Sequence, residues 1–333
     1  MNAARFPIKQ KKTELRNLPF NLGLIGFGSC GKIQYDALKT VRSQFSLQMV
    51  SDIEKKSMKD TVRFTNNYTE ILKNPAIEAV SIATPPSTHF EIAIDALSAG
   101  KHVLVEKPHA LTVDQCNQMI AMAKQKEKVL FMSFHARYHP VVEAARKELT
   151  GKDVTGIRIQ YSEYAPNYHA SDGWIFNPEI SGGGVLMDSG INALSIVTYV
   201  LPNLPGFTVS DAQFKNVEHF KVETKAQVEF TFGQAGRGSI SMDWMNTGPE
   251  VRQVIFTADG HEYTVDIVKN IFSKDGIMPM SVDPYRKTVD QVSEYKGVYQ
   301  HFAELLANGV SQTHIHELAF ILAAYRKAGL YTS

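Results

Sequence analysis

The sequence contains little cysteine, no long apolar run and almost no excess of charge. Only Cys30 and Cys116 occur among 333 residues, which argues against a disulfide framework or a thiolate metal site. A net charge of +1 gives no reason to expect nucleic acid or an anionic membrane as a partner. No apolar run approaches membrane-spanning length, and residues 1–20 lack the apolar core of a signal peptide. We therefore expect a cytoplasmic protein without a metal centre.

Length and composition are those of a globular protein with two domains. The chain is 44% apolar and 21% charged, which is ordinary for this class. We expect residues 1–20 to form a flexible or loosely packed lead-in. Residues 21–145 then form the first domain and residues 146–333 the second, whose last helices pack back on one of the two domains.

The first domain alternates short apolar runs with helical patterns. Five runs read as buried strands: 22–25, 47–50, 78–82, 102–105 and 129–132. Strands that alternate with helices in this way predict a doubly wound parallel sheet with right-handed crossovers. Ligands of such sheets bind beyond the carboxyl ends of the strands.

A Gly-x-Gly-x-x-Gly motif, from Gly26 to Gly31, lies between the first run and a helical pattern. Its glycines allow a tight turn, close approach to a pyrophosphate and close helix packing, and the helix start binds phosphate. The hexapeptide alone also suits a plain glycine turn, but its position favours a dinucleotide site. Asp52 lies 21 residues after Gly31, where an acid binds the ribose hydroxyls. It favours NAD over NADP, although nearby lysines at 55–56 weaken that preference, and it also suits a simple acid at a strand end.

The fourth run leads directly into Glu106-Lys107-Pro108. This places one lysine at the predicted ligand-binding edge, and Pro108 restricts its backbone, more firmly if their peptide bond is cis. Lysine-proline after a strand is also common in plain loops. His89 reads most simply as a polar residue in the first turn of a helix. The residues expected to contact the cofactor are Gly26, Gly28, Ser29, Cys30, Gly31, Asp52, Thr84, Pro85, Glu106 and Lys107.

The second domain changes character. Apolar and polar residues alternate in the segments 157–162, 227–232 and 239–244, and again from Val254. Such strands bury one face, and with few helices between them they predict a largely antiparallel open sheet in an α+β domain. Its other face could cover a second subunit, so we expect a homodimer or homotetramer. The segment from Gly297 to Lys327 reads as helical.

A glycine triplet at 182–184 precedes a broadly apolar helical segment. Asp188 and Asn192 are spaced i, i+4, so in a helix they share one face. Two polar groups on a buried helix need partners, which are either a ligand or each other.

The glycine motif, the Ala-Thr-Pro-Pro-Ser-Thr-His loop at 83–89 and the Glu-Lys-Pro strand end together resemble the Gfo/Idh/MocA oxidoreductases. The resemblance implies that Lys107 lies by the nicotinamide and the reacting hydroxyl. The family pattern has a histidine where this chain has Asn192 and an aspartate where it has Ser195. Asn192 cannot titrate, so a histidine proton relay is excluded there. This departure resembles the aldose 1-dehydrogenase branch of the family.

Two further segments agree with that branch. His135-Ala136-Arg137-Tyr138 is similar to its His-x-Arg-Tyr segment, and Glu163 with Tyr168-His169 is similar to its Glu and Trp-His. Tyr168 in place of tryptophan bears on sugar stacking, and which group is the terminal base stays open. From the residues alone, His135 and His169 also suit loop histidines with local hydrogen bonds. The resemblance implies that His135, Glu163, His169 and Asn192 bind the substrate.

The resulting hypothesis is oxidation of a cyclic aldose such as galactose, arabinose or fucose at C1, with Lys107 and Asp188 as catalytic residues. NAD or NADP accepts the hydride, and no metal is needed because hydride transfer is the chemistry of the cofactor. Two alternatives remain: a cyclitol or sugar dehydrogenase that acts at another ring hydroxyl, and a nucleotide-binding regulator without catalysis.

Overall fold

The structure is a computed structural model. It describes residues 4–7, 19–54, 62–168, 173–204, 206–217, 220–277 and 290–331. The chain divides into two compact units. The parallel-sheet unit contains Ala3–His135 and Gln291–His314, and the mixed-sheet unit contains Ala136–Asp290 and Ile315–Ser333.

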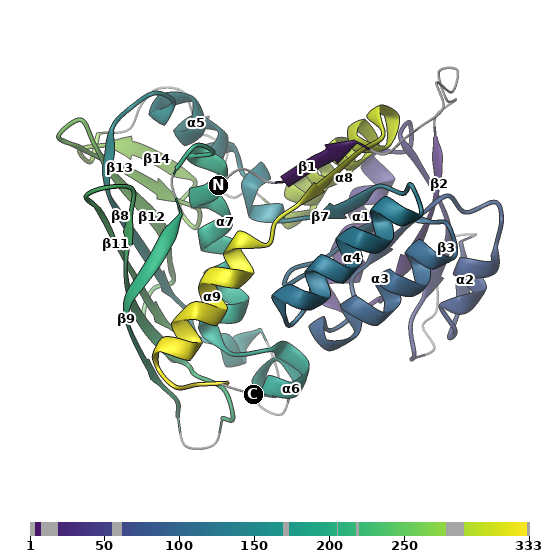
Figure 1. Cartoon of the computed structure of the whole chain (residues 1–333), viewed down its shortest axis with the longest axis horizontal. Coiled ribbons are helices and arrows are strands. Elements are labelled where there is room, and N and C mark those ends of the chain that lie inside the picture. The colour runs from purple at the N-terminus through teal and green to yellow at the C-terminus, as the bar shows by residue number, and fades with distance from the viewer. Residues whose placement is uncertain are drawn as a thin grey trace. The chain divides into compact units, whose positions relative to one another are not determined.

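The described part of the parallel-sheet unit has one eight-stranded sheet in the order β1-β15-β7-β6-β5-β2-β3-β4 (Figure 1). All neighbouring pairs are parallel except β1 with β15 at one edge. The prediction of a doubly wound parallel sheet is confirmed, and each of the five apolar runs coincides with a strand, although the runs 78–82 and 129–132 begin one residue before β5 and β7. The strands are β1 (Ala4–Pro7), β2 (Phe20–Ile25), β3 (Phe45–Ser51), β4 (Arg63–Thr65), β5 (Ala79–Ile82), β6 (His102–Val105), β7 (Leu130–Met132) and β15 (Val310–Thr313).

The order of the strands reverses between β2 and β5. In doubly wound sheets a dinucleotide binds at this reversal, beyond the carboxyl ends of the two strands. The loops that leave β2 and β5 lie side by side, since the N–H of Ala83 donates to the carbonyl of Ile25 at 2.8 Å. The helices of this unit are α1 (Ser29–Thr40), α2 (Thr69–Lys73), α3 (His89–Ser98), α4 (Val113–Gln125) and α8 (Gln291–Asn308), with a short 3-10 turn at Pro86–Thr88.

Two segments of this unit differ from the sequence analysis. Residues 4–7, expected in a lead-in, pair with β15 as an edge strand. The prediction of one helical segment from Gly297 to Lys327 is wrong in its middle. Gly309 has φ +61°, a conformation that ends helices, and Val310 to Thr313 then pair with β7 before α9 (His316–Lys327) begins.

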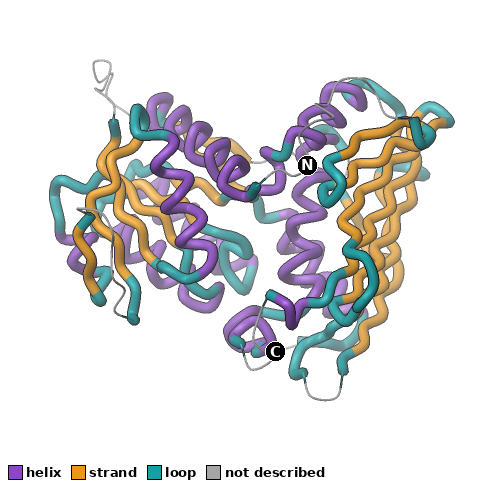
Figure 2. Tube along the Cα trace, turned by 180° about the vertical axis from the view of Figure 1, so that it is seen from behind, coloured by secondary structure: helices purple, strands orange, loops and turns teal. Residues whose placement is uncertain are grey.

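The mixed-sheet unit has a seven-stranded sheet among its described residues, in the order β14-β13-β12-β8-β11-β10-β9. Its strands are drawn in orange on the right of Figure 2. Every pair is antiparallel except β8 with β11, which confirms a largely antiparallel sheet. In β10 alternate side chains are buried, as the sequence pattern predicts. The strands are β8 (Val154–Ser162), β9 (Phe207–Lys215), β10 (Lys225–Phe232), β11 (Gly236–Asp243), β12 (Val251–Ala258), β13 (His261–Asp266) and β14 (Ile271–Lys274).

The helices of the mixed-sheet unit include one irregular turn. Leu186–Gly190 is a π-helical turn that leads directly into α7 (Ile191–Val200). The sequence pattern indicated a helix here but not the π-helical turn. By length and composition, Pro178–Val200 is the one candidate membrane span among the described residues, but 78% of its apolar 18-residue window is buried inside the structure, as in a core helix. The other helices are α5 (Pro140–Leu149), α6 (Pro178–Ser181) and α9, with 3-10 turns at Ala165–Asn167 and Trp174–Phe176, and another at His135–Tyr138 where the units join in sequence.

Candidate active site

The glycine loop between β2 and α1 fits a dinucleotide. Gly26 has φ +95°, and a Cβ there would lie 2.6 Å from the backbone of Ala83. A Cβ on Gly31 would lie 2.1 Å from the carbonyl oxygen of Gly26. Gly28 is exposed, has no atom within 4 Å of an added Cβ, and precedes α1 without a side-chain cap. The turn thus requires two of the glycines, and the third leaves a phosphate access to the helix start.

Asp52 lies immediately after β3 and is fixed against the glycine loop. One carboxylate oxygen accepts the N–H of Phe27 at 2.6 Å, and the other accepts the N–H of Glu54 at 2.9 Å. Each carboxylate oxygen has a further lone pair for a ribose hydroxyl. Residues 55–56, whose lysines weaken the NAD preference, lie outside the described residues.

Lys107 is the second residue after β6, at the carboxyl edge of the parallel sheet. Its side chain is partly buried, and its peptide bond to Pro108 is cis. Its N–H donates to the Glu106 carboxylate at 3.2 Å. The adjoining loop after β5 carries Thr84 and Pro85, both partly buried. The loop with Lys107 follows β6, and the loop with the predicted cofactor contacts Thr84 and Pro85 follows β5. These two strands are neighbours in the sheet.

Glu106 belongs to a buried polar network that the sequence analysis did not predict. Its side chain is 4% exposed and accepts Gln34 Nε2 at 2.9 Å. Gln34 in turn accepts the hydroxyls of Ser81 at 2.7 Å and Tyr299 at 2.8 Å. Gln34 from α1 and Tyr299 from α8 thus help to hold the acid that precedes Lys107.

The side chain of Cys30, which is partly buried, takes part in the same network. Its Sγ lies 3.1 Å from the hydroxyl of Tyr295. Burial, followed by the Glu106 carboxylate, raises the pKa of the Cys30 thiol, so it stays protonated. Cys116 is fully buried, and burial raises its pKa to about 12. Both thiols are therefore poor nucleophiles.

His135 lies at the end of the parallel-sheet unit and is held by α8. Its Nδ1 is 2.5 Å from a carboxylate oxygen of Glu294, and its ring stacks on Tyr295 with centroids 5.2 Å apart. These partners lie about 160 residues along the chain, and sequence spacing gave no signal for them. Substrate binding by His135 stays a prediction.

The π-helical turn that carries Asp188 begins on a buried carboxylate. Glu223 is 3% exposed and accepts the N–H of Gly184 at 2.9 Å and of Leu186 at 3.2 Å. Tyr325 of α9 donates its hydroxyl to Glu223 at 2.7 Å. Burial raises the pKa of Glu223 despite these hydrogen bonds. The glycine triplet serves this contact, since a Cβ on Gly184 would lie 2.0 Å from the Glu223 carbonyl oxygen.

Glu163 is joined to the same turn through a serine. One oxygen of its carboxylate accepts the Ser189 hydroxyl at 3.1 Å, and the other accepts Arg252 at 2.5 Å. Trp244 donates its indole N–H to Ser189 at 3.0 Å. Burial opposes the charge of Arg252, but Glu163 and Glu250 raise its pKa overall. Glu163 and the segment of Asp188 are thus neighbours, and Ser189, Trp244 and Arg252 are supporting residues that sequence reasoning missed.

Asn192 presents an unpaired polar atom. Its Oδ1 is buried and makes no hydrogen bond with any described residue. Buried polar atoms normally have a partner, so this oxygen suits a ligand donor. Tyr168 is 59% exposed and donates its hydroxyl to Glu250 at 3.2 Å, whereas His169 lies outside the described residues.

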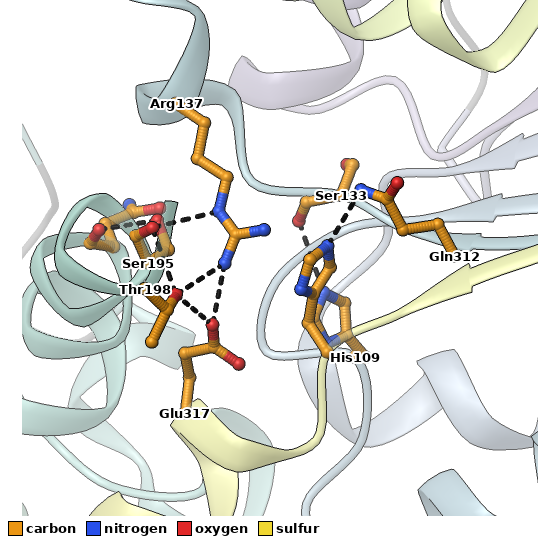
Figure 3. A network of polar contacts seen from close by, with 9 residues as sticks. His109, Ser133, Arg137, Ser195, Thr198, Gln312 and Glu317 are labelled. Atoms are coloured by element: carbon orange, nitrogen blue, oxygen red, sulfur yellow. Dashed lines mark hydrogen bonds and ion pairs between the residues drawn. The ribbon is translucent and has the colours of Figure 1, made fainter. Parts of the chain in front are cut away.

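Arg137 of the His-Ala-Arg-Tyr segment is buried in the mixed-sheet unit. Figure 3 shows its side chain pointing toward Glu317 and Thr198. Its guanidinium donates to Glu317 at 2.6 Å and to Thr198 at 2.9 Å, and its Nε donates to the Ser195 carbonyl at 3.0 Å. In the parallel-sheet unit, His109 Nε2 lies 3.2 Å from the Ser133 carbonyl. Arg137 therefore stabilises the packing of α7 on α9. No cluster of three possible metal ligands occurs within the part of the chain described.

The glycine loop yields a direct prediction. Gly28→Ala should leave the melting temperature nearly unchanged, because an added Cβ meets no atom. The methyl group should clash with a bound pyrophosphate at about 1–3 kcal/mol, which raises the NADH dissociation constant about 5- to 150-fold. Nucleotide titration by fluorescence and thermal melting measure the two effects. Gly31→Ala is the matched variant, and it should also lower the melting temperature; normal NADH binding by Gly28→Ala would contradict the assignment.

A parallel sheet with a glycine loop at its reversal point and a lysine at the neighbouring strand end defines a dinucleotide-dependent oxidoreductase by fold and site. Family models agree with this class. Residues 20–134 match the oxidoreductase family with an NAD-binding Rossmann fold, and residues 142–263 match the GFO/IDH/MocA C-terminal domain. The chain belongs to the Gfo/Idh/MocA oxidoreductase family.

Individual relatives extend the comparison. Galactose 1-dehydrogenase of Pseudomonas fluorescens is 29% identical over 309 residues, covering 92% of this chain and 95% of the relative. D-glucoside 3-dehydrogenase of Escherichia coli is 28% identical over 199 residues, or 57% of this chain and 56% of the relative. The crystal structure of D-galactose-1-dehydrogenase from Rhizobium etli aligns with a TM-score of 0.81 at 26% identity, covering 96% of this chain and 97% of that one.

Proposed function

We propose that this protein is an NAD(P)-dependent aldose 1-dehydrogenase that oxidises a cyclic aldose of the galactose, arabinose or fucose type at C1 to the lactone. The observation that carries the proposal is the position of Lys107 at the end of β6, next to the strand whose loop borders the glycine motif. A basic side chain at this edge suits removal of a hydroxyl proton beside a dinucleotide. The similarity to galactose 1-dehydrogenase over 92% of the chain supports C1 as the reacting position.

The roles of the residues follow from their chemistry. The amine of Lys107 takes the proton of the C1 hydroxyl while the C1–H bond breaks and the C1–O bond becomes a carbonyl. The bound nicotinamide supplies the hydride acceptor. We assign Asp188 as the second catalytic residue, because a carboxylate can accept a proton and pass it on. The lactone product then hydrolyses to the aldonic acid.

We assign substrate recognition to four polar side chains that can form hydrogen bonds with sugar hydroxyls. Asn192 has a buried oxygen ready to accept a sugar hydroxyl, and Glu163 is held rigid by Ser189 and Arg252. We assign the same role to His135 and His169. Sites that hydrogen-bond a hydroxyl discriminate strongly against sugars that leave the groups unpaired. Tyr168 and Trp174, which are 59% and 41% exposed, offer aromatic faces for the apolar side of a sugar ring.

The cofactor preference is assigned to NAD. The fixed carboxylate of Asp52 accepts ribose hydroxyls and repels a 2′-phosphate. We also propose a cytoplasmic homodimer or homotetramer that uses the polar open face of the mixed sheet, which size-exclusion chromatography with light scattering would test.

A ring-hydroxyl dehydrogenase is the second candidate, favoured by the partial similarity to D-glucoside 3-dehydrogenase. Against it stands Asn192, because this position cannot relay a proton. A non-catalytic regulator would need neither Lys107 nor the buried Asn192 oxygen.

A panel of aldoses, cyclitols and glycosides assayed for NADH and NADPH formation distinguishes the three. We expect turnover with several aldoses, faster with NAD, and a lactone as the product. A ketose product would support the second candidate. Nucleotide binding without turnover of any sugar would support the regulator.

The Asn192 assignment makes a separate prediction. Asn192→Leu keeps the branching and the number of side-chain heavy atoms but leaves a sugar hydroxyl unpaired at a cost of about 1–3 kcal/mol. The kcat/KM for the preferred aldose should fall about 5- to 150-fold with unchanged NADH affinity. Ser195→Ala, further along α7, is the control, because its hydroxyl only donates to the Asn192 backbone carbonyl. An equal loss in both variants would point to a helix defect and remove Asn192 from substrate binding.

A further inference from the structure

His89 connects two loops at the carboxyl edge of the parallel sheet. Its ring is 1% exposed and lies at the start of α3. Nδ1 lies 2.8 Å from the carbonyl oxygen of Pro108, and Nε2 lies 2.7 Å from the carbonyl oxygen of Thr84. One side chain thus contacts the lysine loop after β6 and the loop after β5, which carries two predicted cofactor contacts.

Pro108 gives this contact particular weight. Proline has no N–H, so the carbonyl is the one backbone group through which residue 108 can form a hydrogen bond. Lys107 precedes it directly, and its own N–H is bound to Glu106 at 3.2 Å, a longer distance than either contact of His89. The backbone on both sides of the Lys107 side chain is therefore held by side chains, Glu106 before it and His89 after it.

The two contacts make different demands on the imidazole. Both partners are carbonyls, which only accept, whereas a neutral imidazole has one N–H. Burial lowers the pKa of His89; the two carbonyls and Glu106 act in the opposite sense, and Lys107 adds to the lowering. The neutral ring donates to one loop, and the cationic ring donates to both.

We propose that His89 is a positioning residue, which donates from Nδ1 to the Pro108 carbonyl and so fixes the loop that aims the Lys107 amine. The inference rests on the proposed function in so far as Lys107 is the base, but the hydrogen bond itself is independent of any substrate. His89 touches neither the sugar nor the cofactor in this role.

Two substitutions separate the two contacts. The amide nitrogen of asparagine takes the place of Nδ1, so His89→Asn keeps a donor toward Pro108. The amide nitrogen of glutamine takes the place of Nε2, so His89→Gln keeps a donor toward Thr84. His89→Ala removes both. The melting temperature of each variant shows how much of its loss of activity comes from lower stability of the fold.

A positioning role for His89 predicts a loss in kcat with little change in substrate or cofactor binding. His89→Ala and His89→Gln should lose about 10- to 100-fold in kcat, since misplacement of a catalytic group by about 1 Å costs on that order. Their KM for the sugar and their NADH affinity should change less than about threefold. The substitutions misplace the Lys107 amine in the transition state but remove no contact with the bound substrate or cofactor. His89→Asn should recover most of kcat.

Hydrogen exchange tests the inference without a substrate. Amides in residues 106–111 should exchange faster in His89→Ala and His89→Gln but at the wild-type rate in His89→Asn. Equal kcat and equal exchange in the Asn and Gln variants would overturn the inference. If wild type oxidises no sugar, the proposed function fails, while the exchange result still decides the role of His89.

A measurement on the unsubstituted protein guards against unstable variants. Nitrogen-15 NMR of labelled histidine reports which ring nitrogen carries a proton. We expect a protonated Nδ1 on His89. A bare Nδ1, with the only proton on Nε2, would overturn the inference whatever the stability of the variants.

Discussion

Lys107→Met should lower kcat by about 10²–10⁴-fold, the range that a general base contributes. Methionine is unbranched and only one atom shorter than lysine, but it cannot accept a proton. The folded loop should persist, since Lys107 is held through its backbone N–H and through the neighbouring Pro108 carbonyl. NADH affinity should therefore stay close to that of wild type, and the loss should appear in kcat with the preferred aldose.

The matched control removes the same charge elsewhere. Lys126 is exposed and is the C-cap residue of α4, so Lys126→Met should leave kcat unchanged. Initial rates of NADH formation, with fluorescence titration of NADH, give both quantities. Wild-type turnover by Lys107→Met would remove the lysine from the mechanism, and joint loss of turnover and NADH binding would show a cofactor role instead.

Arg137→Met should destabilise the mixed-sheet unit by about 3–5 kcal/mol, as expected when one partner of a buried ion pair is removed. The side chains of Arg137 and Glu317 are 6% and 2% exposed. Without the guanidinium, Glu317 keeps only the Thr198 hydroxyl, at 2.5 Å, and its Oε2 already has no hydrogen bond from the described residues. The melting transition of this unit should fall by about 6–20 °C.

The double variant Arg137→Met/Glu317→Leu tests the cause. Replacing both charges with apolar groups of similar size removes the uncompensated carboxylate and is often neutral for stability. Its melting temperature should therefore lie well above that of the single variant. A double variant as unstable as Arg137→Met would mean that lost packing, and not the buried charge of Glu317, sets the cost.

The parallel-sheet unit was predictable because its signals are local. Each apolar run is short, buried on both faces and followed by a turn, so runs such as His102–Val105 indicate strands without tertiary information. The glycine motif is visible in the sequence itself, although part of its cause is not local: Gly31 has no room for a Cβ beside the Gly26 carbonyl, and Gly26 has none beside Ala83 after β5. The strands β1, β4 and β15 were missed because their sequences, Ala-Arg-Phe-Pro, Arg-Phe-Thr and Val-Ser-Gln-Thr, contain no continuous apolar run.

The supporting residues of the site could not be predicted from spacing. Tyr295 and Glu294 reach His135 from a helix about 160 residues further along the chain, and Arg252 reaches Glu163 from β12. His89 was interpreted as a polar residue in a first turn, since nothing in its local sequence indicates the Pro108 carbonyl. The π-helical turn at Leu186–Gly190 depends on the buried Glu223, whose position is set by tertiary packing.

The central claim is that hydride leaves C1 of the sugar. It is tested most directly with an aldose that carries deuterium at C1 alone, incubated with NAD and the wild-type protein. We predict that deuterium appears at C4 of the reduced nicotinamide, with the lactone as the unlabelled product. Reduced cofactor without deuterium, formed while the label stays on the sugar, would show that another carbon is oxidised and would contradict the proposal.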